Sequence, residues 1–187
     1  MINKLGASLP IDLPADLGAD LKQCNHYYVD NANFALYALT DLKETDLQTI
    51  CASIKRTFVR DVLQIPESEV DDFIFPAPRW SSLAQKTFGE ILEYHIRYLD
   101  KGWRDSQGLN QGEIQWYPFD FVIVTSKDWQ SDGLHLVHYE YNSQSDLFTV
   151  DSCCMQVKDL GISLTSLRSF DDSFENLRRE FEYEAVS

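Results

Sequence analysis

Apolar residues follow helical spacing in the first half of the chain and at its end, and strand-like alternation between them. Helical spacing predicts helices over about residues 13–24, 47–63, 81–100 and 173–185. The clearest run repeats at i, i+3, i+4 and i+7 over about five turns, and it consists of Leu47, Ile50, Cys51, Ile54, Phe58, Val62 and Leu63. Thr45 or Asp46 can cap its start, and Pro66 follows its end.

The segments around the second of these helices have the composition of turns and short strands. Residues 26–42 indicate two short strands around a turn at Asp30 and Asn31. Residues 67–73 predict a short helical turn, and an extended loop is expected to follow through Pro76 and Pro78.

Three later runs are rich in β-branched and aromatic residues, which favour strands: residues 114–126, 133–141 and 146–157. Turn-forming residues at Asp132-Gly133 and over 142–146 separate them. Because the connections are short, we expect the three strands to form an antiparallel meander.

The first of these strands is apolar on both faces. Phe119, Phe121 and Ile123 share one face, and Val122 and Val124 share the other. A strand of this kind is expected in the middle of a sheet, covered on both sides.

The order of elements predicts an α+β fold, with an antiparallel β-meander sheet packed with helices in a single domain. The length of 187 residues fits one domain. We expect a helix-rich part over 1–103, a polar loop over 104–115, the meander over 116–157 and C-terminal helices over 160–185. Strands near residues 27–40 are expected to add to the edge of the sheet.

The net charge of the chain bears most directly on the kind of partner that it could bind. Thirty Asp and Glu residues against sixteen Lys and Arg leave a net charge of -14, although 44% of the residues are hydrophobic. Such a domain disfavours nucleic acid and anionic membranes and favours a basic protein partner. No apolar run has the length of a signal peptide or a membrane span, so a cytoplasmic protein is expected.

Recognisable catalytic and cofactor motifs do not occur. Neither GxGxxG, GxxxxGK[ST], GxSxG nor CxxC is found, so no cofactor and no enzymatic activity are expected. Cys24 and Cys51 lie in helical patterns and are expected to be buried. His95 falls in an apolar helical stripe, which favours a core histidine with satisfied hydrogen bonds over a general base.

Two histidines and two cysteines on the meander are the remaining candidates for chemistry. His135 and His138 lie three residues apart on a strand and so on opposite faces, which argues against a shared metal ion. Cys153 or Cys154 beside one of them is the only Cys–His arrangement that the strand order allows. A mid-strand cysteine that fills the core is the alternative.

Tryptophans among acidic residues are the candidates for binding a protein partner. Tryptophan is enriched in the contacts that dominate interfaces, and carboxylates steer basic partners. The residues with this pattern are Trp103, Asp105, Glu113, Trp116, Asp128, Trp129 and Asp132. The alternative for each tryptophan is a place at the edge of the core.

Four segments of the C-terminal half resemble the SUKH superfamily (SMI1/KNR4-like proteins), which includes many bacterial toxin-immunity proteins. They are WYPFDFVIVTS, the Asp-Gly turn with LHLVHYEY, FTVDSCCMQV, and SLTSLRSFDDSFENLRREF, within about residues 115–181. The resemblance implies stoichiometric binding to a cognate toxin without catalysis, and many such toxins are basic nucleases. The alternatives are a structural or regulatory domain that forms homo-oligomers, and a small enzyme without a recognisable motif.

Overall fold

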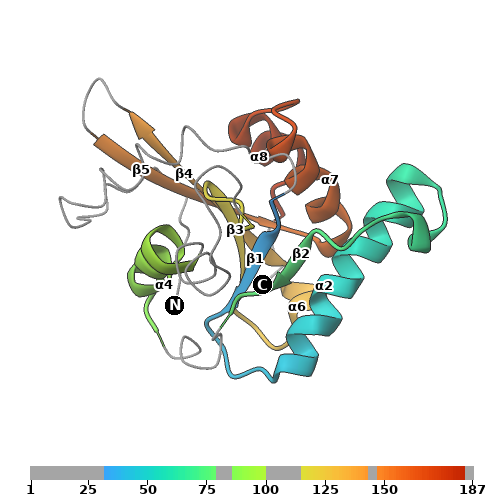
Figure 1. Ribbon diagram of the computed structural model, residues 1–187, viewed down its shortest axis with the longest axis horizontal. Coiled ribbons are helices and arrows are strands. Elements are labelled where there is room, and N and C mark those ends of the chain that lie inside the picture. Colours follow the sequence, from blue (N-terminus) through green and yellow to red (C-terminus); the bar gives the residue numbers. More distant parts are fainter. Residues whose placement is uncertain (1–31, 79–85, 100–114, 143–146, 184–187) are drawn as a thin grey trace.

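The computed structural model describes residues 32–78, 86–99, 115–142 and 147–183. The expected helix over 13–24, the turn at Asp30 and Asn31, and nearly all of the loop over 104–115 lie outside these residues. Within them the chain has the expected α+β fold, a sheet packed with helices on both faces (Figure 1).

Five strands form the sheet in the order β2-β1-β3-β4-β5. The strands span β1 Phe34–Ala38, β2 Ile74–Pro76, β3 Asp120–Val124, β4 Leu134–Asn142 and β5 Leu147–Met155. β3, β4 and β5 form the expected antiparallel meander, whereas β1 runs parallel to both β2 and β3. The sheet is therefore mixed, with its parallel part on one side and the meander on the other (Figure 1).

β1 adds to the edge of the antiparallel meander by pairing with β3, as expected, but it runs parallel to β3, and β2 extends the sheet beyond it. The expectation of a loop at residues 74–76 was wrong, because β2 is a strand. Phe34 donates its N–H to Phe73 O at 2.7 Å, and Ala77 donates to Leu36 O at 2.9 Å. These bonds join segments far apart in the chain, and Pro76 is tolerated because β2 is an edge strand, where a missing N–H interrupts no bond to a further strand.

Helices cover the two faces of the sheet unequally. One face packs against α2 (Glu44–Phe58), α7 (Val157–Arg168) and α8 (Phe174–Phe181), and the other against α4 (Phe88–Tyr94) and the π-helical turn η3 (His95–Leu99) (Figure 1). The helices expected over 47–63, 81–100 and 173–185 are present, but residues 86–87 precede α4 and residues 182–183 follow α8 without helical structure. A single turn, α6 (Trp129–Asp132), joins β3 to β4.

β3 has the central position that its two apolar faces predict. All five of its residues are buried. Val122 and Val124 face the core beneath α2, α7 and α8, whereas Phe121 and Ile123 face the core beneath α4. Phe119, just before the strand, packs against both. Alternation along one strand therefore supplies both layers of the core.

The apolar face of α2 continues into a π-helical turn, η1 (Val59–Leu63). The predicted inner residues Leu47, Ile50, Cys51, Ile54 and Phe58 are all buried. Asp46 caps the start, because its carboxylate accepts the N–H of Lys43 at 2.8 Å. The short helical turn expected next is reduced to η2 (Glu67–Glu69).

His95 is the buried core histidine that the pattern predicted. Burial lowers its pKa to about 3, so the ring is neutral at neutral pH. Its Nε2 lies 3.0 Å from the carbonyl oxygen of Tyr117, which can only accept, so Nε2 carries the proton. Nδ1 therefore accepts a hydrogen bond from the hydroxyl of Tyr37 at 2.9 Å.

We expect Tyr37→Phe to lower the free energy of unfolding by about 1–3 kcal/mol, because it leaves a buried acceptor on His95 without its donor. Tyr183→Phe is the control, since its hydroxyl donates to Ser131 O in an exposed hydrogen bond. Urea unfolding of both variants measures the difference. An equal loss of unfolding free energy in the two variants would show that the buried hydrogen bond stabilises the protein no more than the exposed one does.

None of the described helices combines the length and the apolar character that a bilayer crossing requires.

Candidate functional site

The tryptophans within the described residues are not exposed. Trp116 is 5% exposed and packs edge-on against Phe75, with 6.4 Å between ring centroids. Trp129, on α6, is 8% exposed and belongs to the core beneath α2. Both rings therefore lie in the core, the alternative place that the sequence offered, and neither presents an exposed face to a partner. Trp103, Asp105 and Glu113 lie outside the described residues.

Asp128 and Asp132 are exposed, as the partner hypothesis required. Asp128 precedes the single turn of α6 and Asp132 is its last residue, which accepts a hydrogen bond from the hydroxyl of Ser131 at 3.1 Å. The indole between them, Trp129, turns inward. These two carboxylates therefore lack the exposed aromatic neighbour that the sequence suggested.

Three exposed apolar residues lie at the end of α2, and a fourth, Phe170, which is 70% exposed, follows α7. Val62, Leu63 and Ile65 are 40%, 38% and 41% exposed. They occupy η1 and the residues after it, which project beyond the sheet (Figure 1). We call these three residues the apolar tip. Sequence periodicity had placed Val62 and Leu63 on the inner face of the helix. The helix extends beyond the core, so these two side chains remain exposed.

The backbone at the apolar tip has an unusual conformation. Gln64 has a positive φ of 55° and donates its N–H to Val59 O at 2.7 Å, closing the wide π-helical turn. A non-glycine residue in the left-handed region is uncommon, and π-helical turns are frequent at functional sites. The turn directs consecutive aliphatic side chains outward.

Acidic residues follow the apolar tip directly. Glu67, Glu69, Asp71 and Asp72 are all exposed, and we call residues 67–72 the acidic connector. Arg56 lies 3.8 Å from Glu67, and Lys55 lies 2.7 Å from Asp72. Glu69 and Asp71 form no ion pair with any residue that the structure describes, so the connector keeps negative charge.

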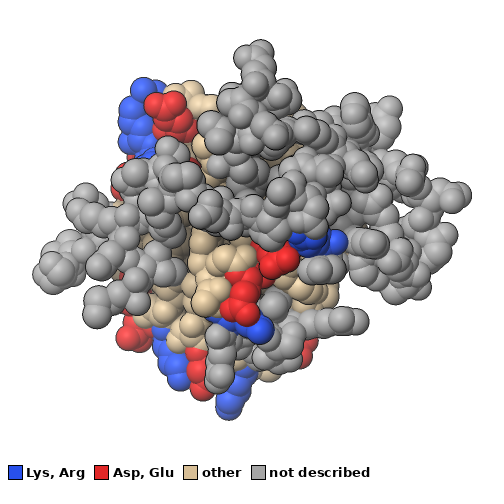
Figure 2. Space-filling view, turned by 90° about the vertical axis from the view of Figure 1, so that its left-hand side faces the viewer, with Lys and Arg blue, Asp and Glu red and all other residues tan. Residues whose placement is uncertain are grey.

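The α4 side of the molecule differs in charge. On that side, several groups of described charged residues show acidic and basic side chains next to each other (Figure 2). On α4 and the residues flanking it, Lys86 pairs with Glu90 at 3.0 Å and Arg97 with Glu93 at 3.4 Å. Paired charges of this kind leave little net field, unlike those of the acidic connector.

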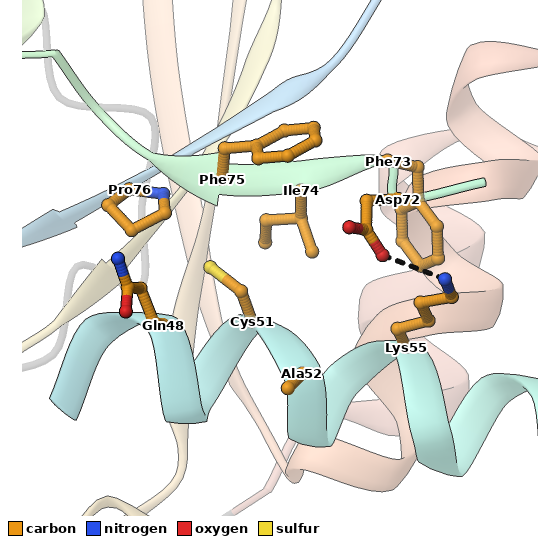
Figure 3. A pocket seen from close by; sticks show the side chains of 9 residues that line it. All are labelled: Gln48, Cys51, Ala52, Lys55, Asp72, Phe73, Ile74, Phe75 and Pro76. Carbon is orange, nitrogen blue, oxygen red and sulfur yellow. Dashed lines mark hydrogen bonds and ion pairs between the residues drawn. The ribbon is translucent and has the colours of Figure 1, made fainter. Parts of the chain in front are cut away.

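A groove lies between α2 and β2, where the acidic connector joins the sheet (Figure 3). Its volume is about 260 Å³, and it is lined by Gln48, Cys51, Ala52, Lys55, Asp72, Phe73, Ile74, Phe75 and Pro76. The middle of the groove is apolar, with Gln48 at one end and the Lys55–Asp72 pair at the other (Figure 3). Burial raises the pKa of the Cys51 thiol, so this group is neutral.

His138 and Asp120 form a pair on the opposite part of the sheet. They face each other in the register of β3 and β4, and Nδ1 lies 2.8 Å from Oδ1. Asp120 is 1% exposed, and burial raises the pKa of its carboxyl against the opposing effect of His138. The ring of His138 stacks on Phe174 of α8 at 5.0 Å.

This pair has one feature that is expected of an enzyme site. A histidine beside a carboxylate with a raised pKa fits general acid–base chemistry. The groove, however, is lined by neither residue. Instead, the pair holds α8 against the sheet, together with Arg178, which lies 2.9 Å from Asp151.

The Cys–His arrangement considered from the sequence does occur in the strand register. His135 of β4 lies directly opposite Cys154 of β5. Burial raises the pKa of the Cys154 thiol and lowers the pKa of His135, so each neutral form is favoured. A catalytic thiolate requires the opposite shift of the thiol pKa. Cys153 is buried core filler, as the alternative predicted.

His135 and His138 lie on opposite faces of β4, as the spacing predicted. Val137 and Tyr139, on the same face as His135, belong to the core beneath α4. His138 points to the other face, toward α8. The described residues contain no group of three or more His, Cys, Asp or Glu side chains arranged to hold a metal ion.

No protein-family model, no curated protein and no solved structure matches this chain.

Proposed function

We propose that this chain is an acidic protein-binding domain whose partner presents a basic surface. The observation that carries the proposal is the adjacency of the exposed apolar tip and the acidic connector on one projecting segment. Aliphatic side chains that lose water on contact supply affinity. Unpaired carboxylates beside them speed encounter with a positive partner and discriminate against a negative one.

In biological terms we propose a bacterial immunity protein that acts in the cytoplasm and neutralises a basic toxin by direct binding. Support comes from the resemblance of residues 115–181 to the SUKH superfamily and from the net charge of -14. Neutralisation of this kind needs tight stoichiometric binding and no turnover. The neutral thiols of Cys51 and Cys154 are consistent with a binding role.

The test is capture of partners from the native host with matched variants of the domain. We expect the wild-type chain to retain one basic protein at equal stoichiometry, released as salt rises. Replacing the apolar tip with Val62→Ser and Leu63→Ser should weaken binding of that protein by about tenfold or more. Titration calorimetry on the purified pair measures the change.

Charge variants complete the test. Glu69→Gln with Asp71→Asn should slow association and flatten its salt dependence. Glu175→Gln with Glu180→Gln on α8 is the control, because it removes the same charge from exposed positions away from the connector. If both charge variants behave alike, the connector has no special role. If the captured protein binds the apolar-tip variant as well as it binds wild type, the proposed surface is wrong.

Self-association is the second candidate, because an exposed aliphatic group can also pair with a second copy. Sedimentation of the purified chain distinguishes the two. A dimer abolished by Val62→Ser and Leu63→Ser would favour a homo-oligomeric domain over one that binds a basic partner.

A further inference from the structure

The groove between α2 and β2 extends the proposed function to a specific mode of recognition. Resting on that function, we infer that the groove receives an uncharged apolar side chain from an extended segment of the basic partner. A neighbouring Lys or Arg of that segment pairs with the acidic connector at the rim. The occupant is thus an apolar–basic stretch of protein, not a free small molecule.

The size of the groove fits one or two side chains. Its volume of about 260 Å³ is below that of most sites for drug-sized ligands, which begin at about 300 Å³. An aliphatic or small aromatic side chain fills such a space, and its burial removes apolar surface from water on both partners.

The walls of the groove select an uncharged occupant. Cys51 lies on the α2 side and Ile74 and Phe75 on the β2 side (Figure 3). The thiol of Cys51 is neutral, because burial raises its pKa. A charged group placed among these residues would lose its hydration without gaining a counterion, so an apolar side chain is favoured.

The rim selects a cation. The Lys55 side chain is 13% exposed and already paired with Oδ1 of Asp72, whereas the Asp72 side chain is 61% exposed. Asp72 therefore reaches solvent and can share a second cation, and Asp71 lies next to it in the chain. An anionic occupant would have to displace Asp72 from Lys55 while facing the rest of the acidic connector.

The apolar groove and its acidic rim lie close enough for adjacent residues of one partner segment to contact both. Asp72 precedes Phe73 and Ile74 directly, so the acidic rim runs into the apolar wall without a gap. Consecutive side chains of an extended strand point to alternate sides, about 3.3 Å apart along the chain. With an apolar residue in the groove, its neighbour starts on the solvent side of the segment, and only a long side chain such as that of Lys or Arg reaches back to the exposed carboxylates of the connector.

The test uses two capped peptides of equal charge as probes, Ser-Leu-Arg-Leu-Arg-Ser and Ser-Ser-Arg-Ser-Arg-Ser. Binding to the ¹⁵N-labelled chain is followed by chemical-shift titration, which detects weak binding. We expect the leucine peptide to bind about tenfold tighter, as burial of one aliphatic side chain predicts. Its largest shifts should fall at Cys51, Ala52, Ile74 and Phe75.

Matched variants of α2 locate the contact. Ala52 is exposed and lines the groove, so Ala52→Phe should fill it and abolish the advantage of the leucine peptide. Thr49→Phe adds the same ring at an exposed position of α2 outside the groove and should leave the advantage intact. Circular dichroism and thermal unfolding verify that both variants fold.

The outcomes separate the inference from the function on which it rests. If both peptides bind equally and in a salt-dependent way, the groove is not the site, while an acidic binding surface stands. If the leucine peptide keeps its advantage in Ala52→Phe, the inference is likewise overturned. If neither peptide binds, the inference fails, and the capture experiment alone decides the proposed function.

Discussion

Replacing His138 with phenylalanine is expected to lower the free energy of unfolding by about 3–5 kcal/mol at about pH 8. The substitution keeps an aromatic ring against Phe174, so it changes packing little. It removes the hydrogen bond from Nδ1 to the carboxylate of Asp120, which is 1% exposed. Removing one partner of a buried pair is costly, because the remaining charge has neither water nor a counterion.

The loss is expected to shrink as the pH falls. Burial raises the pKa of Asp120 in the folded protein, so the folded state binds its proton more tightly than the unfolded state. Stability linked to this group is then present below the unfolded pKa and is lost as pH rises through the folded pKa. Without His138 the folded pKa rises further, so acidification to about pH 5 should restore part of the lost stability.

Urea unfolding at the two pH values measures this effect, with Asp120→Asn combined with His138→Phe as the control. The double variant carries no charge at the pair, so it should be more stable than His138→Phe at the higher pH. It should also lack the recovery on acidification. A loss in His138→Phe that is the same at both pH values would show that Asp120 is not the cause.

Gly161→Ala is expected to destabilise the protein by about 2 kcal/mol, although alanine favours helices over glycine by about 1 kcal/mol. Gly161 is buried in α7 where this helix crosses α2. A Cβ atom there would collide with Cβ of Phe58 and lie 3.2 Å from the carbonyl oxygen of Ile54. Neither atom is the far end of a flexible side chain, so the two helices must move apart.

Gly89→Ala is the matched control and should have the opposite sign. Gly89 lies in α4, and a Cβ there would meet no atom within 4 Å. The same substitution should therefore raise the free energy of unfolding by up to about 1 kcal/mol, through helix propensity alone. Thermal and urea unfolding of both variants measure the contrast. A stabilising effect at Gly161 would show that α2 and α7 can separate at little cost.

Local periodicity accounts for most of the elements. The five inner residues of α2 and the two apolar faces of β3 were identified because helices and strands repeat at fixed short periods. The opposite placement of His135 and His138 follows from the same alternation. Features of this kind can be predicted from residues that are close together in the sequence.

The candidate site was not predictable in the same way. Periodicity assigned Val62 and Leu63 to the core. Whether a side chain is exposed depends instead on whether another element packs against it, which periodicity does not show. Trp116 and Trp129 suggested an interface, but the folding of their segments onto the sheet buries them. The acidic connector was visible as a run of carboxylates, yet nothing local showed that it borders a groove.

The amino-acid sequence by itself determined the α+β class, the antiparallel meander, the positions of the main helices and the negative charge, since each depends on composition or on short-range spacing. Only the tertiary structure decided that β1 pairs in parallel between β2 and β3, that Asp120 meets His138, and that a groove opens between α2 and β2. The reason is physical. These features join residues distant in the chain, and their free energy comes from burial and pairing that exist only once the whole core has formed.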